Sequence, residues 1–404
     1  MMNGVFTQSL SQWMNSLSVD RVLMLFMAIF ALIGAIDQIC GNRHGYGAAF
    51  TEGLCMMGSL AQTVAAVFAA APLLARLLTP VFTPFLHKFH ADACALAGVL
   101  LPSDMGGYAL AMEMADSPAI GNFSGLILGG TVGSIWVFTL PVALSILTER
   151  DRPLFASGIL CGLITIPFGC LTGGFLMNFT DFALPFQTIL LHTLPVAGLA
   201  LLVGAGLWLQ PNRTIQLFSY FGKAITVIGT LLTVIAIFEQ LTGILLPFFD
   251  IMTKKNTAGL TGFEEGLLLC GKIALVLSGA FPMVLWMKKH GTPLLGKIEQ
   301  LLGINSVASL GLLAVCANCI PAFTAMKDMD DRGKIITAAF AAGGGFALGD
   351  YLGFAAGAEP QMILPMLGAK FISGILGVLL ASVLSPILIS RSIRNVPTNT
   401  NLKG

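Results

Sequence analysis

Long apolar stretches, separated by short polar ones, occupy almost the whole of this 404-residue chain. Several exceed the roughly 20 apolar residues that a helix needs to cross a bilayer. Three of them, 117–148, 153–180 and 300–326, contain no Asp, Glu, Lys or Arg. The pattern predicts an all-α, polytopic integral membrane protein with one transmembrane domain over 1–404. The predicted apolar segments are 20–40, 52–77, 90–115, 119–148, 153–179, 185–209, 217–249, 263–288, 300–326, 334–357 and 361–390.

Two of these segments are interrupted by helix-breaking residues. The first holds PSDMGG at 102–107, and the second holds ANCIP at 317–321. Proline removes a backbone donor and disrupts a helix interior. At membrane depth such breaks are tolerated only inside protein or beside a water-filled cavity. We therefore expect the two breaks to meet near the membrane midplane.

The chain also repeats itself. The motif FTEGLCMMG at 50–58 returns as FEEGLLLCG at 263–271, and SGIL recurs from 157 to 373 at nearly the same offset. The repeats predict two five-segment halves, 20–179 and 233–390, with a connector helix at 185–209. Whether the halves are parallel or inverted stays open. Such halves are typical of transporters, with the substrate site between them, and the alternative is a duplicated membrane protein that transports nothing.

Composition supports the membrane assignment and narrows the function. The chain is 56% hydrophobic and 10% charged, with a mean hydropathy of +0.86, whereas soluble domains carry about 25% charged residues. The net charge of +1 gives no reason to expect a nucleic-acid partner. No cleavable signal peptide is evident, so the run at 22–36 is interpreted as the first membrane helix.

No motif for an enzyme or a cofactor is apparent. Nucleotide, metalloprotease and nucleophile-elbow signatures are missing from the sequence. The CxxC of Cys316 and Cys319 lies in an apolar stretch and favours packing. Four of the five histidines show no ligand spacing among themselves, namely His87, His90, His192 and His290. We therefore predict a protein that is not an enzyme, with no cofactor and no metal.

Asp350 is the leading candidate for a substrate-binding residue. It is the only charged residue in 335–358, and five glycines surround it in GGGFALGDYLG. A charge at bilayer depth costs on the order of 3 kcal/mol even on permissive scales, which makes such residues functional candidates. The neighbouring Tyr351 adds an aromatic face, so the pair suits a small ammonium. A structural aspartate that pairs with a lysine or a helix end is the alternative.

Asp104 is the second candidate, because it lies at the first break. Its counterpart in the repeat is Asn318, at the second break, and Tyr108 shares a helical face with Asp104 if that stretch is helical. The alternative role for Asp104 is to cap the following helix.

Glu52 and Glu265 complete the candidate set as equivalent residues of the two repeats. We expect both to lie at the starts of matching helices. A glutamate in the first turn is also what the helix dipole favours, so for this pair the structural interpretation is preferred.

Four blocks give the chain a family resemblance. They are SDMGGYALAMEMA, FSGLILGGTVGSIWVFTLPVAL, GAFPMVLWM and FALGDYLGFAA. In their order and spacing they resemble the EutH family of bacterial ethanolamine-utilisation operons. The resemblance implies a multi-pass protein of the bacterial inner membrane that imports ethanolamine for breakdown by a cobalamin-dependent lyase. It leaves open whether transport is facilitated or coupled to protons or sodium.

Three other functions compete with ethanolamine transport. The first is transport of another small cation or amino compound, and the second is a membrane sensor or scaffold. An intramembrane enzyme is disfavoured by the missing catalytic motif. Gly125, Gly129 and Gly133 form a small-residue pattern that is suited to packing within the chain or between subunits of a homo-oligomer. The polar end from Arg394 onward is predicted to be a short disordered tail.

Overall fold

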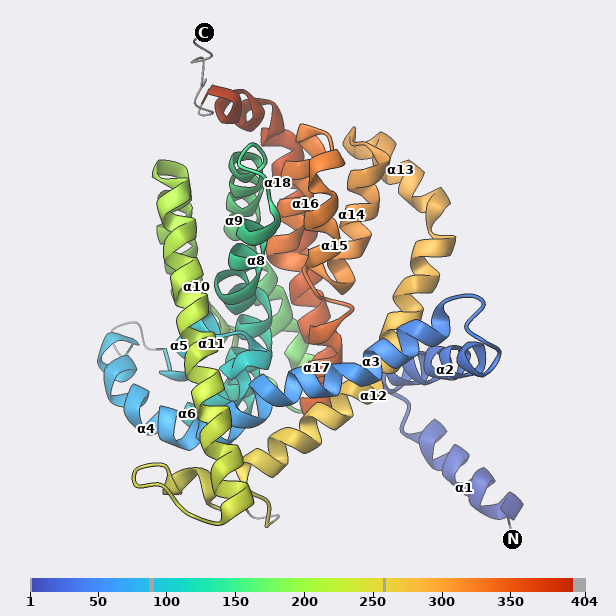
Figure 1. Ribbon diagram of the computed structural model, residues 1–404, viewed down its shortest axis with the longest axis vertical. Coiled ribbons are helices and arrows are strands. Elements are labelled where there is room, and N and C mark those ends of the chain that lie inside the picture. The colour runs from blue at the N-terminus through green and yellow to red at the C-terminus, as the bar shows by residue number, and fades with distance from the viewer. Residues whose placement is uncertain (1, 87–90, 257–258, 395–404) are drawn as a thin grey trace.

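The computed structural model describes residues 2–86, 91–256 and 259–394. Within these ranges the chain is helical, and its only β-type pairing is the isolated bridge between Lys255 and Thr261. The predicted all-α class is confirmed (Figure 1). The predicted disordered tail lies outside the described residues. The α-helices of the first part of the chain are α1 (Met2–Asn15), α2 (Val19–Ile39), α3 (Tyr46–Leu60), α4 (Ala66–Leu86), α5 (Cys94–Leu100), α6 (Gly107–Met114), α7 (Pro118–Asn122), α8 (Leu140–Ile146) and α9 (Arg152–Leu176). Those that follow are α10 (Phe186–Leu209), α11 (Pro211–Thr242), α12 (Gly262–His290), α13 (Thr292–Leu302), α14 (Ser306–Ala317), α15 (Cys319–Ala325), α16 (Asp331–Gly344), α17 (Asp350–Ala358) and α18 (Ile363–Arg394).

Eight helical spans of the described residues are long and apolar enough to cross a membrane. A ninth is possible if α13 and α14, which bend by 116° at their junction, form one broken span. The protein is therefore a multi-pass membrane protein. The predicted segment 185–209 corresponds to α10. The predicted segment 217–249 ends early as a helix, because Gly243 adopts a left-handed conformation (φ 70°) directly after α11.

Two long helical spans contain π-helical turns. The π-helix η1 (Ala61–Ala65) joins α3 to α4. The π-helices η4 (Phe123–Gly133) and η5 (Ile135–Thr139) lie between α7 and α8. π-Helical turns are rare and frequently occur at functional sites, and η4 is fully buried against the first helix break.

Both predicted breaks are present. Leu101–Gly106 separates α5 from α6, and Asn318 separates α14 from α15. In each pair the two short helices pack against one another, and Figure 1 shows α14 and α15 side by side. A third break, which was not predicted, separates α16 from α17 at Gly345–Gly349.

Three helices, α9, α16 and α18, form the most extensive packing in the protein (Figure 1). Small residues make this approach possible. A Cβ at Gly158 would lie 2.3 Å from the Ile335 carbonyl oxygen, and one at Gly169 would lie 2.4 Å from the Ala369 carbonyl oxygen. The hydroxyl of Thr165 donates to the carbonyl of Ser373 at 3.0 Å. Because lipid removes the hydrophobic drive for helix association, close packing through small residues replaces it.

The order of elements is similar in the two predicted halves. This order does not test whether the halves arose by duplication. A long helix, a broken pair, a further helix and a long packing helix occur as α3–α4, α5/α6, α7–α8 and α9. They occur again as α12, α14/α15, α16/α17 and α18. The internal duplication stays a prediction. The predicted small-residue stripe packs within the chain, since Gly125 faces Tyr108 and Gly133 faces the Leu101 carbonyl.

Gly98 provides a test of the packing between α5 and η4. A Cβ there would lie 1.8 Å from the Ser124 carbonyl oxygen, so Gly98→Ala forces two backbones apart. We expect it to lower the free energy of unfolding by about 1–3 kcal/mol or more, as overpacking does. Thermal unfolding in detergent measures this. Gly229→Ala in α11 is the matched control, because nothing lies within 4 Å of that site. Equal stability of the two variants would contradict the packing.

Candidate functional site

Hydrogen bonds with residues of the π-helical segments hold the first break. The ring nitrogen of Trp136 donates to the Val99 carbonyl at 2.9 Å, and the hydroxyl of Ser103 donates to the Gly125 carbonyl at 2.6 Å. The turn itself closes through the Gly107 amide, which donates to Pro102 at 2.8 Å. These bonds satisfy backbone groups that the break would otherwise leave unpaired in an apolar interior.

Gly106 shows why this turn needs glycine. It has φ 100°, in the left-handed region, and a Cβ there would lie 2.2 Å from the Val67 side chain. It is also the N-cap of α6, and no side chain makes a capping bond there. The alternative role for Asp104, capping the following helix, is therefore wrong.

The third break places Asp350. The amides of Phe346 and Leu348 donate to the Val315 and Cys316 carbonyls at 2.9 and 2.7 Å. These two bonds attach the turn segment between α16 and α17 to the end of α14. Gly349 lies so close to Ala317 that a Cβ would be 2.2 Å from its carbonyl oxygen. As a result α17 begins at Asp350, next to the first break.

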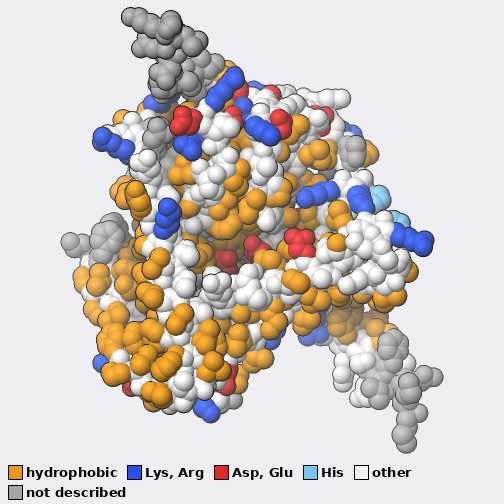
Figure 2. Space-filling model, in the orientation of Figure 1, with side chains coloured by type: hydrophobic (Ala, Val, Ile, Leu, Met, Phe, Trp, Pro, Cys, Tyr) orange, Lys and Arg blue, Asp and Glu red, His pale blue; other side chains and the backbone are white. Residues whose placement is uncertain are grey.

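Asp104 and Asp350 line the same cavity, about 40 Å³ in volume. The other lining residues are Pro102, Met105, Ser134, Phe138, Phe346 and Tyr351. The volume exceeds the roughly 10–15 Å³ that one water requires, so there is room for a few small heavy atoms. Figure 2 shows acidic side chains in the hollow near the middle of the view, within a largely hydrophobic surface.

Neither carboxylate of this cavity has a cationic partner within ion-pair distance among the described residues. The Oδ1 atom of Asp104 is buried and makes no hydrogen bond with any residue that the structure describes. A buried polar atom without a partner costs about 1–3 kcal/mol. Tyr351 and Ser134 line the cavity beside the two carboxylates. The site is thus an anionic, aromatic pocket with an acceptor left open.

Sequence reasoning missed one charged residue of this site, Lys370. Its side chain is fully buried in α18. Its ammonium donates to the Gly130 carbonyl and lies 4.1 Å from the centroid of the Tyr351 ring. The residue is the only charged one in 360–390, so the rule that singled out Asp350 would have found it.

Tyr108 and Glu265 lie at a different cavity. They line a more open space of about 540 Å³, together with residues of α4 and the segment before α12. The Tyr108 ring packs edge-on against Phe354, with ring centroids 5.7 Å apart. Because Phe354 belongs to α17, the helix that starts at Asp350 reaches from one cavity towards the other.

The structure does not bring Asn318 or Glu52 into the lining of either cavity. The side chain of Asn318 accepts from the Ile320 amide at 2.9 Å and caps α15. Glu52 is exposed on α3, well past the first turn, because that helix starts at Tyr46. Placing Glu52 at a helix start was therefore wrong, whereas Glu265 does lie in the first turn of α12.

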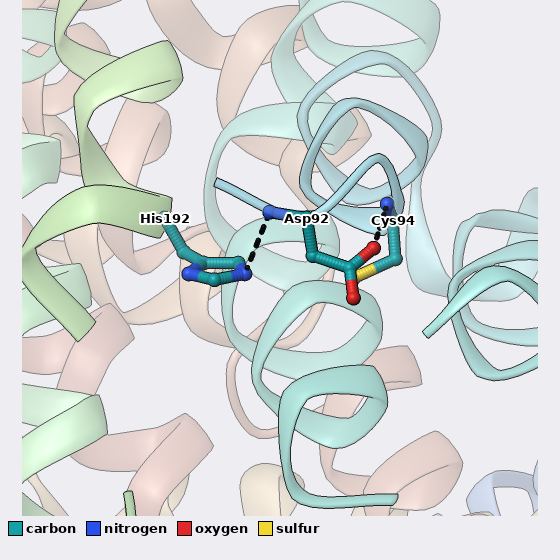
Figure 3. Close-up of side chains that lie close together, drawn as sticks. All are labelled: Asp92, Cys94 and His192. Atoms are coloured by element: carbon teal, nitrogen blue, oxygen red, sulfur yellow. Dashed lines mark hydrogen bonds between the residues drawn. The ribbon is translucent and has the colours of Figure 1, made fainter. Parts of the chain in front are cut away.

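A second polar cluster joins Asp92, Cys94 and His192 (Figure 3). Their ligand-type atoms lie within 4.8 Å of one another, as in sites that hold a metal ion. Sequence spacing gave no sign of this, since Asp92 and His192 are 100 positions apart. Each atom is already engaged. The His192 Nε2 atom accepts from the Asp92 amide at 3.2 Å, and its Nδ1 atom donates to the Thr188 carbonyl at 2.8 Å.

The other members of the cluster are engaged in the same way. The carboxylate of Asp92 accepts from the amides of Cys94 and Asp116, both at 3.0 Å. The thiol of Cys94 lies 3.1 Å from the Ser124 hydroxyl. The hydrogen bonds alone account for the grouping, which fastens the start of α5 to α10.

This interpretation gives a second test. His192→Leu removes the acceptor of the Asp92 amide, so we expect it to lower the free energy of unfolding by about 1–3 kcal/mol. A metal chelator should leave the melting temperature of the unchanged protein where it is. His290→Leu is the control, because that exposed histidine makes the same type of bond within its own helix, to Trp286, and no second contact of this kind. Destabilisation of the unchanged protein by chelator would point to a metal site instead.

Comparison of the sequence with known proteins identifies the family of this chain. The family model described as "Ethanolamine utilisation protein, EutH" matches residues 19–384. This chain belongs to the EutH family. The "Probable ethanolamine permease EutH" of Listeria monocytogenes is 41% identical over 90% of this chain and 93% of its own length. The protein of the same name in Salmonella typhimurium is 36% identical over 92% and 96%.

A further relative carries no functional name. The "Uncharacterized protein YxeR" of Bacillus subtilis is 38% identical over 92% of this chain and 96% of its own length. No solved structure matches this chain. Membership of a permease family supports a membrane transporter of a small molecule, rather than an enzyme.

Proposed function

We propose that this protein imports ethanolamine across the bacterial inner membrane. The observation that supports the proposal most is the cavity between the first and third breaks, where neither Asp104 nor Asp350 has a described cation within ion-pair distance. Both residues are half-buried, and carboxylates inside an apolar protein are costly unless something compensates their charge. A small cation that enters the cavity supplies that compensation.

Ethanolamine fits this site by charge, size and polarity. Its ammonium can pair with a carboxylate and lie over an aromatic ring. The ammonium of Lys370 already lies over the Tyr351 ring in this way. Its single hydroxyl can bond to a neighbouring polar group such as Ser134, which lines the same cavity. Its few heavy atoms match a small cavity better than a larger amino compound would.

The larger cavity suggests how the substrate arrives. Tyr108 and Glu265 line it, and Phe354 separates Tyr108 from the start of α17. We propose that this space, which Glu113, Lys254 and Lys255 also line, is the approach to the inner cavity. Asn318 and Glu52 have no place in the proposed site, because neither lines a cavity of the path.

The predicted repeats are consistent with a transport mechanism in which two halves move relative to one another. Sites between two halves, at interrupted helices, are the usual arrangement in secondary transporters. We propose that the two five-segment units move relative to one another to expose the cavity to each side in turn. Uptake into proteoliposomes with and without a proton or sodium gradient separates a facilitator from a coupled carrier. Failure of purified protein to take up ethanolamine under any gradient would refute the proposal.

The sharpest variant is Asp350→Asn. It keeps the size of the side chain and removes the charge, so ethanolamine uptake should fall at least about tenfold while membrane insertion is retained or improved. Initial uptake at low substrate, normalised to protein in the membrane, measures it. Asp328→Asn, in an exposed turn after α15, is the control and should transport normally. A structural aspartate would give the reverse result, namely lower yield with intact transport per molecule.

Substrate discrimination offers an independent check. Ethylene glycol replaces the ammonium by a second hydroxyl and would leave the cavity carboxylates without a counter-charge. We expect it to compete with labelled ethanolamine at least about a hundredfold more weakly than unlabelled ethanolamine does. Equal competition by both compounds would argue against an anionic site.

A further inference from the structure

Lys370 is the charged group beside the cavity to which the proposed function gives no role. Its ammonium donates to the Gly130 carbonyl and lies over the Tyr351 ring, and it has no ion pair with a described carboxylate. Lys334, which is also buried, instead forms an ion pair with Asp151 at 2.8 Å. A cation buried without a carboxylate partner is costly, so its position calls for an explanation.

The surroundings of Lys370 connect it to the two carboxylates. Its ammonium interacts electrostatically with Asp104, and Asp104 with Asp350. The Tyr351 ring lies 4.1 Å from the Lys370 ammonium, and Tyr351 lines the same cavity as Asp104 and Asp350. The remaining titratable groups that face the ammonium are three thiols, of Cys170, Cys316 and Cys319. With both carboxylates and the ammonium ionised, the group carries a single net negative charge.

We propose that Lys370 limits the cavity to one added positive charge, and so makes it selective for monovalent amines over diamines. This inference rests on the proposed function, since it concerns the same site. A monovalent ammonium brings the group to neutrality. A dication would leave an uncompensated positive charge in a medium of low dielectric, where charge interactions are strong.

Ethylenediamine is the matched probe, because it replaces the hydroxyl of ethanolamine by a second ammonium at the same chain length. Below neutral pH it carries two charges. In proteoliposomes, its competition against labelled ethanolamine should be weak for the unchanged protein. In Lys370→Met and Lys370→Gln the preference should shift about tenfold or more towards the diamine. The Gln variant also keeps a donor for the Gly130 carbonyl, and Lys370→Arg, which keeps the charge, should retain the original preference.

The controls separate charge selection from a purely structural lysine. The double variant Lys334→Met/Asp151→Asn removes a buried ion pair elsewhere and should leave the preference unchanged. If the Met or Gln variant inserts and its preference equals that of the unchanged protein, the inference is overturned. If the unchanged protein takes up no ethanolamine, the proposed function fails instead.

A second variant keeps the inference testable if neutral residues at position 370 prevent insertion. Asp104→Asn alone leaves no net charge and should lose most ethanolamine uptake. Asp104→Asn/Lys370→Met restores one net negative charge and should recover uptake together with the preference for ethanolamine over the diamine. A double variant that is no better than Asp104→Asn alone, or that fails to insert where Asp104→Asn inserts, would overturn the inference.

Discussion

The structure depends on how the backbone groups freed by broken helices are satisfied where water is excluded. Within a bilayer each unpaired amide or carbonyl is costly, so a helix can be interrupted only where a neighbour supplies the missing bond. Trp136 does this at the first break, where its ring nitrogen donates to the Val99 carbonyl. At the third break, the amides of Phe346 and Leu348 do it by bonding to the end of α14. The same bonds place Asp104 and Asp350 on one cavity, so the site follows from the way the breaks are held.

Close packing through small residues provides the second constraint. The helices α9, α16 and α18 approach so closely that Gly158 and Gly169 leave no space for a side chain. The π-helical segment η4 lies between this group and the first break, with Gly98 of α5 against Ser124. A rigid, well-packed frame of this kind can hold carboxylates in positions that are costly for the chain alone, which is a requirement of any preorganised binding site.

The charged groups in and beside the cavity distinguish it from a simple packing defect between helices. Lys370 is fully buried, yet its ammonium contacts a carbonyl and a ring rather than a carboxylate. The Asp104 carboxyl keeps an acceptor without a partner. Where structure alone sets the arrangement, buried charges pair directly, as Lys334 does with Asp151. Incomplete compensation is the pattern expected of a site that binds a cation reversibly, because a fully paired carboxylate would have to lose a partner first.

The sequence by itself determined the all-α membrane class, most of the apolar helices and the first two breaks, and it singled out Asp350 as a candidate. Those features follow from local chemistry: apolar length, Pro and Gly, and an isolated charge in an apolar run. The sequence also shows Lys370 as an isolated charge, but it does not predict that this residue lies beside the cavity. Only the tertiary structure decided the partners. In the folded protein His192 bonds to Asp92, and Lys370 lies over the Tyr351 ring. Asn318 and Glu52 are exposed, and a break separates α16 from α17. The reason is that a segment apolar on all sides carries no periodic pattern to show which face meets which neighbour. That choice is made by backbone pairing and small-residue contacts between segments far apart in the chain.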